Sequence, residues 1–269
     1  MKKSLIAFAL AGLSVAPAFA EEAAPAPEHT IAGNAGIFSS YRFRGIDQTF
    51  GKPALQGGVD YSHSSGFYVG NWNSNVNEGA GYPSGNLEMD FYGGYKTTIG
   101  SVGIDVGGIY YYYPGTNVTG LTNRGKTHSG SINNKELYVG ASWEFLSLKY
   151  YRAIDDYFSM PDTKGTSYVD LSANYDLGDG WGVNGHVGRL NYKNFTNGNY
   201  TDWKVGVTKD INGWVFGLSY IDTNAKGNCG KSEPYCFSNN VDDSGTAVTN
   251  AKFKDAGRAT AVLSVSKTF

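Results

Sequence analysis

The sequence predicts an all-β protein, a transmembrane antiparallel β-barrel of about 12 strands arranged as an up-and-down meander. Three observations lead to this prediction. Apolar and polar residues alternate with period two in twelve segments, and the connections between these segments alternate between short and long. Aromatic residues make up 14% of a chain whose mean hydropathy is only −0.34, and no segment after residue 20 is long and apolar enough for a membrane-spanning helix.

The first 20 residues have the composition of a secretory signal peptide. Two lysines precede an apolar run, which ends in Ala18-Phe19-Ala20 before Glu21, and this is an A-x-A cleavage pattern. An N-terminal anchor helix is the alternative, but the apolar run is short and no stop-transfer sequence follows it. We therefore expect export, a short periplasmic leader over residues 21–29, and an outer-membrane barrel over residues 30–269.

The alternation is clearest in residues 102–113, which end in four consecutive tyrosines. One face of this segment carries Val102, Ile104, Val106, Tyr110 and Tyr112, and the other carries Asp105, Tyr111 and Tyr113. Period two indicates a strand. The twelve segments lie near residues 30–44, 53–63, 67–75, 86–96, 102–113, 135–143, 145–153, 167–176, 181–191, 201–210, 214–223 and 257–269.

The connections between these segments alternate strictly in length. The short ones are 64–66, 97–101, residue 144, 177–180 and 211–213, and the long ones are 45–52, 76–85, 114–134, 154–166, 192–200 and 224–256. Short turns at one end and long loops at the other are typical of outer-membrane barrels, and termini at the short-turn end require an even number of strands. A secreted β-sandwich has no reason to separate its loops in this way.

The tyrosine run falls where a strand would end beside the long loops. Tyr110 and Tyr112 are expected in an aromatic girdle at the lipid headgroups, while Tyr111 and Tyr113 point inward. Other lipid-facing aromatic residues are expected near strand ends, namely Tyr41, Tyr95, Trp143, Trp181, Trp203, Trp214, Tyr220 and Phe269. The C-terminal "AVLSVSKTF" resembles the signal that the barrel-assembly machinery reads through a terminal phenylalanine, although Lys267 departs from it. Lipid and lipopolysaccharide would surround such a barrel.

The inward positions are expected to form a polar lumen. By parity, the candidate lumen-lining residues are Arg42, Arg44, Asp60, Glu88, Asp90, Asp105, Glu136, Lys149, Asp170, His186, Lys204 and Arg258, together with Lys96 and Asp202. The mixed signs predict weak charge selectivity. Arg42 and Arg44 near the outer mouth either favour anions there or pair with acidic residues across the lumen. Twelve tilted strands leave a bore of at most roughly 10 Å, which loops 114–134 and 224–256 would narrow.

Several segments share a resemblance to one bacterial family. They are "YRFRGIDQTFGKPALQGGVDY" (41–61), "GIDVGGIYYYYPG" (103–115), "ELYVGASWEFLSLKYY" (136–151), "TDWKVGVTKDINGWVFGLSYIDT" (201–223) and "LSVSKTF" (263–269). They resemble the TorF family, also called Gcw_chp, and this resemblance implies a Gram-negative outer membrane and a pore without a defined substrate. We therefore expect a porin-like channel for small hydrophilic solutes or ions. A non-conducting adhesive or scaffold barrel acting through its loops is the alternative.

Motifs for catalysis and for cofactors are nearly absent. The four histidines are scattered along the chain, and His186 with Asp170 imitates a general base and its orienting partner without a nucleophile nearby. The sequence thus predicts no enzyme activity, no cofactor and no metal site, with an outer-membrane enzyme as the least favoured alternative. A net charge of −2 gives no reason to expect a nucleic-acid partner. The oligomeric state stays open.

The two cysteines are expected to form a disulfide bond. Cys229 and Cys236 both fall in the longest loop, where Gly230 and Pro234 permit a tight return of the chain. Cysteines of exported proteins usually pair in the oxidising periplasm. Two free thiols or a catalytic dithiol are the alternatives.

Overall fold

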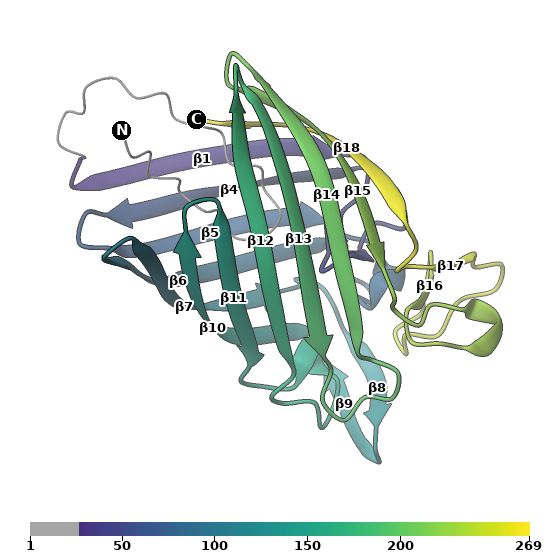
Figure 1. The fold of residues 1–269 in the computed structure, drawn as a ribbon. Helices are drawn as coiled ribbons and strands as arrows, with labels where there is room; N and C mark the ends of the chain where they lie inside the picture. Colours follow the sequence, from purple (N-terminus) through teal and green to yellow (C-terminus); the bar gives the residue numbers. More distant parts are fainter. Residues whose placement is uncertain (1–26) are drawn as a thin grey trace.

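The computed structural model describes residues 27–269, so the predicted signal peptide and most of the predicted leader lie outside the described residues. Twelve antiparallel strands form a closed barrel (Figure 1). The strands are β1 (His29–Phe38), β4 (Ala54–His63), β5 (Phe67–Asn75), β6 (Leu87–Ile99), β7 (Val102–Tyr112), β10 (Asn133–Trp143), β11 (Leu146–Ala153), β12 (Ser167–Gly178), β13 (Trp181–Asn191), β14 (Tyr200–Ile211), β15 (Trp214–Thr223) and β18 (Thr260–Thr268). The predicted twelve-stranded meander is confirmed.

The long connections carry the remaining secondary structure. They contain three small two-stranded sheets, made of β2 (Arg42–Phe43) with β3 (Ile46–Asp47), β8 (Val118–Asn123) with β9 (Lys126–Gly130), and β16 (Cys236–Ser238) with β17 (Phe253–Asp255). Three 3₁₀ turns, η1 (Glu78–Ala80), η2 (Tyr157–Ser159) and η3 (Cys229–Lys231), complete them. No helix among the described residues is long and apolar enough to cross a membrane.

The strands pair with their sequence neighbours around the ring, and β1 closes it against β18. The order is β1-β18-β15-β14-β13-β12-β11-β10-β7-β6-β5-β4. β1 pairs with β4 over ten positions but with β18 over only five, from Asn34 to Phe38. Among residues 27–269, the first part of β1 therefore has a partner strand on one side only.

Tight turns define one end of the barrel. In one turn Asp179 and Gly180 have φ angles of 51° and 74°, and in another Asn212 and Gly213 have φ angles of 55° and 81°. Two consecutive left-handed residues suit a two-residue hairpin turn. We call this end the short-turn end, and the opposite end, which bears β8, β9, β16 and β17 in Figure 1, the long-loop end. The separation of loop lengths that the sequence predicts is thus present in the fold.

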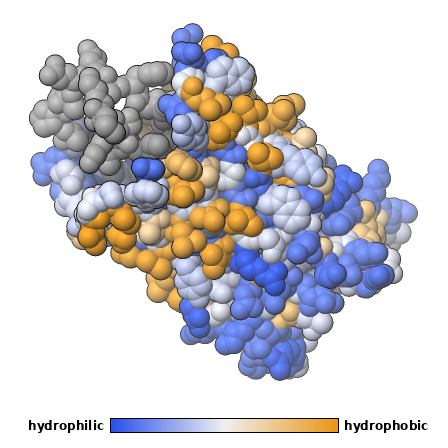
Figure 2. Space-filling model, viewed as in Figure 1, coloured by the Kyte–Doolittle hydropathy of each residue, from blue (hydrophilic) through white to orange (hydrophobic). Residues whose placement is uncertain are grey.

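Alternation along each strand gives the barrel an apolar outside and a largely polar inside. Val205 and Leu263 face outward and are 62% and 63% exposed, whereas inward-facing Glu88 is 1% exposed. Figure 2 shows apolar residues gathered over the strands, with hydrophilic residues covering the long-loop end. An outward apolar surface of this extent is stable against lipid hydrocarbon, and ring closure pairs the strand edges there except along the first residues of β1.

Candidate functional site in the barrel interior

The barrel interior is the candidate site, and it is closed near the long-loop end by residues 39–53, which we call loop 1. This connection joins β1 to β4 and enters the barrel instead of standing above it. Phe43 packs edge-to-face on Tyr111 of β7, and Tyr41 packs on Trp72 of β5. Arg44 reaches β10, which lies across the ring from β1. Loop 1 therefore spans the bore.

Arg44 is the side chain that ties loop 1 to the far wall. Its guanidinium makes a two-pronged ion pair with Glu136, with Nη1–Oε1 and Nη2–Oε2 distances of 3.0 and 2.7 Å. Nη1 also donates to the Tyr157 hydroxyl at 3.0 Å, and the guanidinium lies 4.3 Å above the ring of Tyr168. Both charged groups are buried, and this planar, bidentate geometry is the one that arginine forms best with a carboxylate.

A second set of charges fixes the base of loop 1. Asp47 lies 2.5 Å from the Lys254 ammonium and 3.7 Å from Arg42. Arg42 also donates to the Ala256 carbonyl at 2.9 Å and to the Thr260 hydroxyl at 2.8 Å. These contacts join loop 1 to the connection that precedes β18, so two loops close the same part of the bore together.

The structure corrects the predicted placement of Tyr41, Arg42, Arg44 and Arg258. β1 ends at Phe38, so Tyr41, Arg42 and Arg44 lie in loop 1 and not on a strand of the barrel wall. Tyr41 was predicted to face lipid, but it is buried inside the barrel and donates to Glu88 at 3.2 Å. Arg258 precedes β18 and is exposed. The chain leaves the sheet at Ser39, after which alternation no longer reports a barrel face.

Acidic residues on β6 lie beneath loop 1 in the long-loop half. Glu88 and Asp90 are both buried, beside Tyr41 and Tyr113. Glu88 is the neighbouring side chain of the Asp90 carboxyl, and within residues 27–269 neither amide atom of buried Asn134 has a hydrogen-bond partner. Buried polar atoms are nearly always paired with protein or water, so this region calls for water or a polar solute.

The short-turn half of the interior is polar and partly accessible. Lys149 forms an ion pair with Asp105 at 2.7 Å, and the Tyr68 hydroxyl donates to the same carboxylate at 2.6 Å. Asp60 accepts from Tyr92 at 2.6 Å. The predicted lumen residues differ in burial: Glu88, Asp90, Glu136 and Asp202 are buried near the long-loop end, and Asp60, Asp170, His186, Lys149 and Lys204, at several levels of the wall, are half-buried.

His186 lies between two carboxylates. Its Nδ1 is 2.6 Å from Asp170, and its Nε2 is 2.9 Å from Asp202. A general base needs one ring nitrogen free to accept a substrate proton, whereas both nitrogens are engaged here. Ser172, the nearby hydroxyl, donates to Asp170 and not to the imidazole. The imidazole and its two carboxylate partners thus connect β12, β13 and β14.

The outer face carries the predicted girdle residues near the strand ends. Tyr110, Tyr112 and Trp203 lie toward the long-loop end, and Trp143, Trp181 and Trp214 lie at the short-turn end. The Lys267 ammonium lies 5.0 Å from the Trp214 ring and 5.8 Å from that of Phe269, so this departure from the C-terminal pattern has a cation–π partner. Tyr111 and Tyr113 are buried inside, as their positions in the alternation predict.

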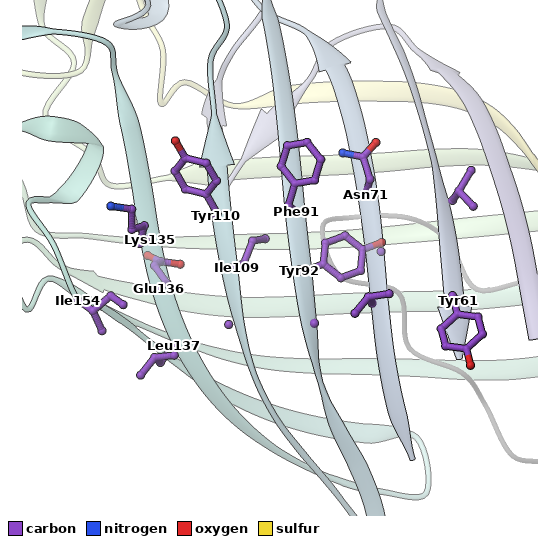
Figure 3. Close-up of a pocket in the computed structure, with 15 residues that line it drawn as sticks. Tyr61, Asn71, Phe91, Tyr92, Ile109, Tyr110, Lys135, Glu136, Leu137 and Ile154 are labelled. Carbon is purple, nitrogen blue, oxygen red and sulfur yellow. The ribbon is translucent and has the colours of Figure 1, made fainter. Parts of the chain in front are cut away.

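A shallow groove crosses the outer face of β5, β6, β7 and β10 (Figure 3). Gly93 and Gly108 are paired in register, and because they carry no side chains, the surface is hollow between Val69 and Leu137. Tyr110 lies along its edge. This groove faces the lipid side of the wall and does not open into the lumen.

The predicted disulfide bond is confirmed. Cys229 and Cys236 are bonded, with a Cα–Cα distance of 5.0 Å. The bond closes a small loop between η3 and β16, outside the barrel wall.

Sequence reasoning missed several interior residues. Buried Trp72 occupies an inward position of β5 that parity alone would have identified. Asp47, Tyr157 and Lys254 lie in loops, where no periodic pattern marks them. The histidines were considered scattered, but His29 and His63 lie directly opposite each other on neighbouring strands.

Comparisons with solved structures find only distant similarities. The KdgM porin in complex with disordered oligogalacturonate is 7% identical, with 89% of this chain and 97% of that chain covered, at a TM-score of 0.49. The NanC porin is 9% identical, with 89% of this chain and 99% of that chain covered, at a TM-score of 0.46. OmpT of Vibrio cholerae is 10% identical, with 92% of this chain and 99% of that chain covered, at a TM-score of 0.42. At these identities and TM-scores the similarities do not bear on function. No curated protein matches the sequence significantly.

The family comparison covers almost the whole chain. Residues 22–269 match the family described as "Bacterial protein of unknown function (Gcw_chp)". That description includes neither the TorF name nor the pore that the resemblance implied. The chain belongs to the Gcw_chp family.

Proposed function

We propose that the protein is a porin-like channel of a Gram-negative outer membrane, that it passes small hydrophilic solutes or ions by diffusion, and that its described conformation is closed. The observation that carries the proposal is that loop 1, and not the barrel wall, fills the bore. Loop 1 is held by side-chain contacts such as Arg44–Glu136 and by backbone hydrogen bonds to other connections, such as the Asp47 N–H to the Ala256 carbonyl. None of these contacts belongs to a strand pair of the barrel wall, so loop 1 can move while the wall stays intact. Such loops are a recurrent way to narrow or close a barrel.

The chemistry of the wall supports a hydrophilic path. Asp60, Asp105 and Lys149 line the short-turn half, and Asp170 and Glu136 continue the polar path toward the long-loop end. A barrel that served only as an anchor would gain stability from an apolar interior, because buried charges cost desolvation energy. Since both signs alternate around the wall, the channel should discriminate only weakly between cations and anions.

The orientation follows from the loop lengths and the N-terminal sequence. An exported barrel places its short turns in the periplasm and its long loops outside the cell. Lipid and lipopolysaccharide then surround the apolar band, and the barrel-assembly machinery would engage Phe269.

Conductance in planar bilayers tests the channel. We expect sparse or small openings for the wild-type protein and frequent, larger ones for Arg44→Ala, because the ion pair that holds loop 1 to the far wall is lost. Lys52→Ala is the matched control, since Lys52 is an exposed cation of the same loop and its removal changes the charge equally.

Absence of conductance in all three folded proteins would contradict the channel and favour a second function. That alternative is an adhesive or scaffold barrel, and the features that favour it are the β8–β9 hairpin and the disulfide-bonded loop at the long-loop end (Figure 1). Binding to cells or matrix that is lost when residues 118–130 are removed, with folding intact, would then identify the working surface.

A further inference from the structure

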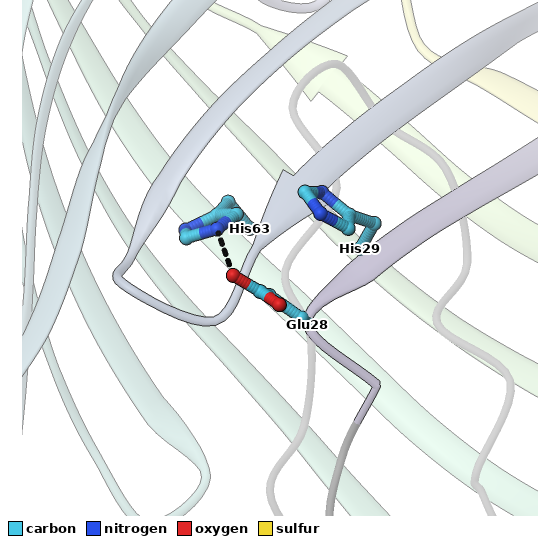
Figure 4. Close-up of side chains that lie close together, drawn as sticks. All are labelled: Glu28, His29 and His63. Carbon is cyan, nitrogen blue, oxygen red and sulfur yellow. Dashed lines mark ion pairs between the residues drawn. The ribbon is translucent and has the colours of Figure 1, made fainter.

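Glu28, His29 and His63 lie together on the outer surface at the short-turn end, where β1 begins and β4 ends (Figure 4). Among the described residues this is the only group of three histidine, cysteine or acidic side chains whose ligand atoms all lie within 4.8 Å of one another. The sequence separates the two histidines by more than thirty positions, so only the strand register reveals the cluster.

The register explains why the two imidazoles meet. His29 is directly opposite His63, and the Ser64 N–H donates to the Glu28 carbonyl at 2.9 Å. Antiparallel pairs alternate between hydrogen-bonded and non-hydrogen-bonded, so His29 and His63 form a non-hydrogen-bonded pair, the kind with the closest side chains. Their ring centroids are 5.1 Å apart. The Ser64–Glu28 bond also holds the Glu28 backbone beside them.

The nitrogens are arranged as in metal-binding histidines. His29 Nδ1 lies 2.9 Å from the Tyr61 hydroxyl, and His63 Nδ1 lies 2.6 Å from the Ser65 hydroxyl. A partner on one ring nitrogen fixes the imidazole and leaves the other nitrogen for an ion. His63 Nε2 points to Glu28, 3.4 Å from its Oε1 (Figure 4). The Ser65 N–H donates to the same Nδ1 at 3.1 Å, so without an ion the proton lies on Nε2, beside Glu28. An ion at Nε2 takes the place of this proton, and Nδ1 then takes up a proton that it donates to the Ser65 hydroxyl.

We propose that Glu28, His29 and His63 bind a divalent first-row transition ion of the Zn²⁺ type. Two imidazoles and one carboxylate form a donor set that suits Zn²⁺, whereas Mg²⁺ and Ca²⁺ prefer oxygen ligands only. Three protein ligands leave a fourth position for water. The ion would join the start of β1 to the end of β4, at the part of β1 that has no partner on its other side.

Zinc titration of the refolded full-length protein in detergent micelles tests the site. Competition with a chromophoric chelator should show one tight equivalent, and His29→Ala and His63→Ala should each weaken it by about tenfold or more. Glu28→Gln should weaken it less. His128→Ala, which removes an imidazole of hairpin β8–β9 at the opposite end, should leave it unchanged, and Mg²⁺ should not compete.

A second measurement avoids reliance on the variants. Zn²⁺ should protect His29 and His63 of the wild-type protein from diethylpyrocarbonate, as mass spectrometry of the peptides would show, without protecting His128. Equal affinity of wild type, His29→Ala and His63→Ala would overturn the proposal, and so would equal labelling of all three histidines with and without Zn²⁺.

Discussion

The two halves of the barrel interior are made from the same twelve strands, yet they differ in what fills them. Near the long-loop end, Trp72, Glu88 and Glu136 are each 1% exposed, because loop 1 and its neighbouring loops pack against them. Near the short-turn end, Asn34, Asp60 and other inward residues keep contact with open space. The wall is alike in both halves, so the difference arises from the loops. Strand alternation therefore predicts that a lumen exists, but it does not predict whether the loops leave that lumen open.

The charges in the two halves are held differently as well. In the long-loop half the Arg44–Glu136 pair is surrounded by Tyr157, Tyr168 and Phe43, so loss of either partner strands a charge away from water. In the short-turn half, a charge that loses its partner can be solvated. The first kind of pair costs much more to break than the second.

Breaking the buried pair from the wall side should give the largest effect. Glu136→Gln leaves the Arg44 guanidinium without its counter-charge, at a cost of about 3–5 kcal/mol in the free energy of unfolding. Asp60→Asn, the same change in the short-turn half, should cost about 1 kcal/mol or less because its partners are neutral groups. Urea unfolding in micelles, followed by the gel shift between folded and heated protein, measures both.

A double variant shows whether the loss of stability in Glu136→Gln comes from the charge left unpaired or from the change at position 136 itself. Arg44→Met with Glu136→Gln removes both charges and should recover much of the loss, since nothing is left unpaired. Equal losses for Glu136→Gln and Asp60→Asn would mean that the two halves are not distinct in the way that their burial indicates.

Close packing of loop 1 against the wall should give the next largest effect. Gly45 has φ +79°, and a Cβ there would lie 2.5 Å from Thr223 Cγ2 and 2.7 Å from Asp202 Cβ. Gly45→Ala should therefore displace loop 1, adding a clash to the roughly 1 kcal/mol cost of a left-handed alanine. Gly120 has the same φ with no atom within 4 Å of such a Cβ. Gly120→Ala therefore measures the cost of the left-handed backbone alone, without a clash.

Protease susceptibility of loop 1 and single-channel recordings compare the two variants. Gly45→Ala should be cut more rapidly within residues 39–53 and should open more often than Gly120→Ala. If both variants behaved alike, contact with the wall would not be what keeps loop 1 inside the barrel.

The sequence predicts the wall of the barrel better than its contents, for a physical reason. Period-two alternation reports the side on which a residue lies, and it placed Trp203 outside and Tyr111 inside. It failed at Tyr41, which is inside and not outside, since the same alternation continues after the chain has left the sheet at Phe38. Arg44 lies inside the barrel and pairs with an acidic residue across it, as one of the two interpretations expected, but from loop 1 and not from a barrel strand. The Arg44–Glu136 pair joins residues 92 positions apart, and no local pattern encodes such a contact.

The metal cluster illustrates a different limit. Both His29 and His63 were placed near predicted strands, but their pairing depends on the register between β1 and β4. A two-residue turn between two strands fixes their register, so the register can be predicted from the sequence. The 15-residue loop between β1 and β4 does not fix it. The disulfide bond could be predicted because its two cysteines are close in the chain and no other cysteine competes.

Acid should loosen the base of loop 1 by a smaller amount. Burial would raise the pKa of the Asp47 carboxyl, but Arg42 and Lys254 outweigh it, so the pKa lies below its usual value. An aspartate with a lowered pKa stabilises the fold above the ordinary value of roughly 4 and loses this contribution as pH falls through the folded pKa. Cutting within residues 39–53 by pepsin should therefore rise toward pH 3 more steeply in wild type than in Asp47→Asn. Parallel pH profiles would contradict this role of Asp47.

Removal of the disulfide bond should have the smallest effect on the barrel, because the bond lies outside both halves. Closing about eight residues contributes roughly 2.5 kcal/mol in the chain-entropy model, and Cys229 and Cys236 are joined within one connection, so this contribution stays local. Cys229→Ser with Cys236→Ser should leave the gel shift on heating unchanged and raise protease cutting within residues 224–256. Alkylation of both thiols in native, non-reduced protein would exclude the bond. Unfolding of the whole barrel in the double variant would instead show that this loop, like loop 1, holds the long-loop half together, because it contains Lys254, which contacts Asp47.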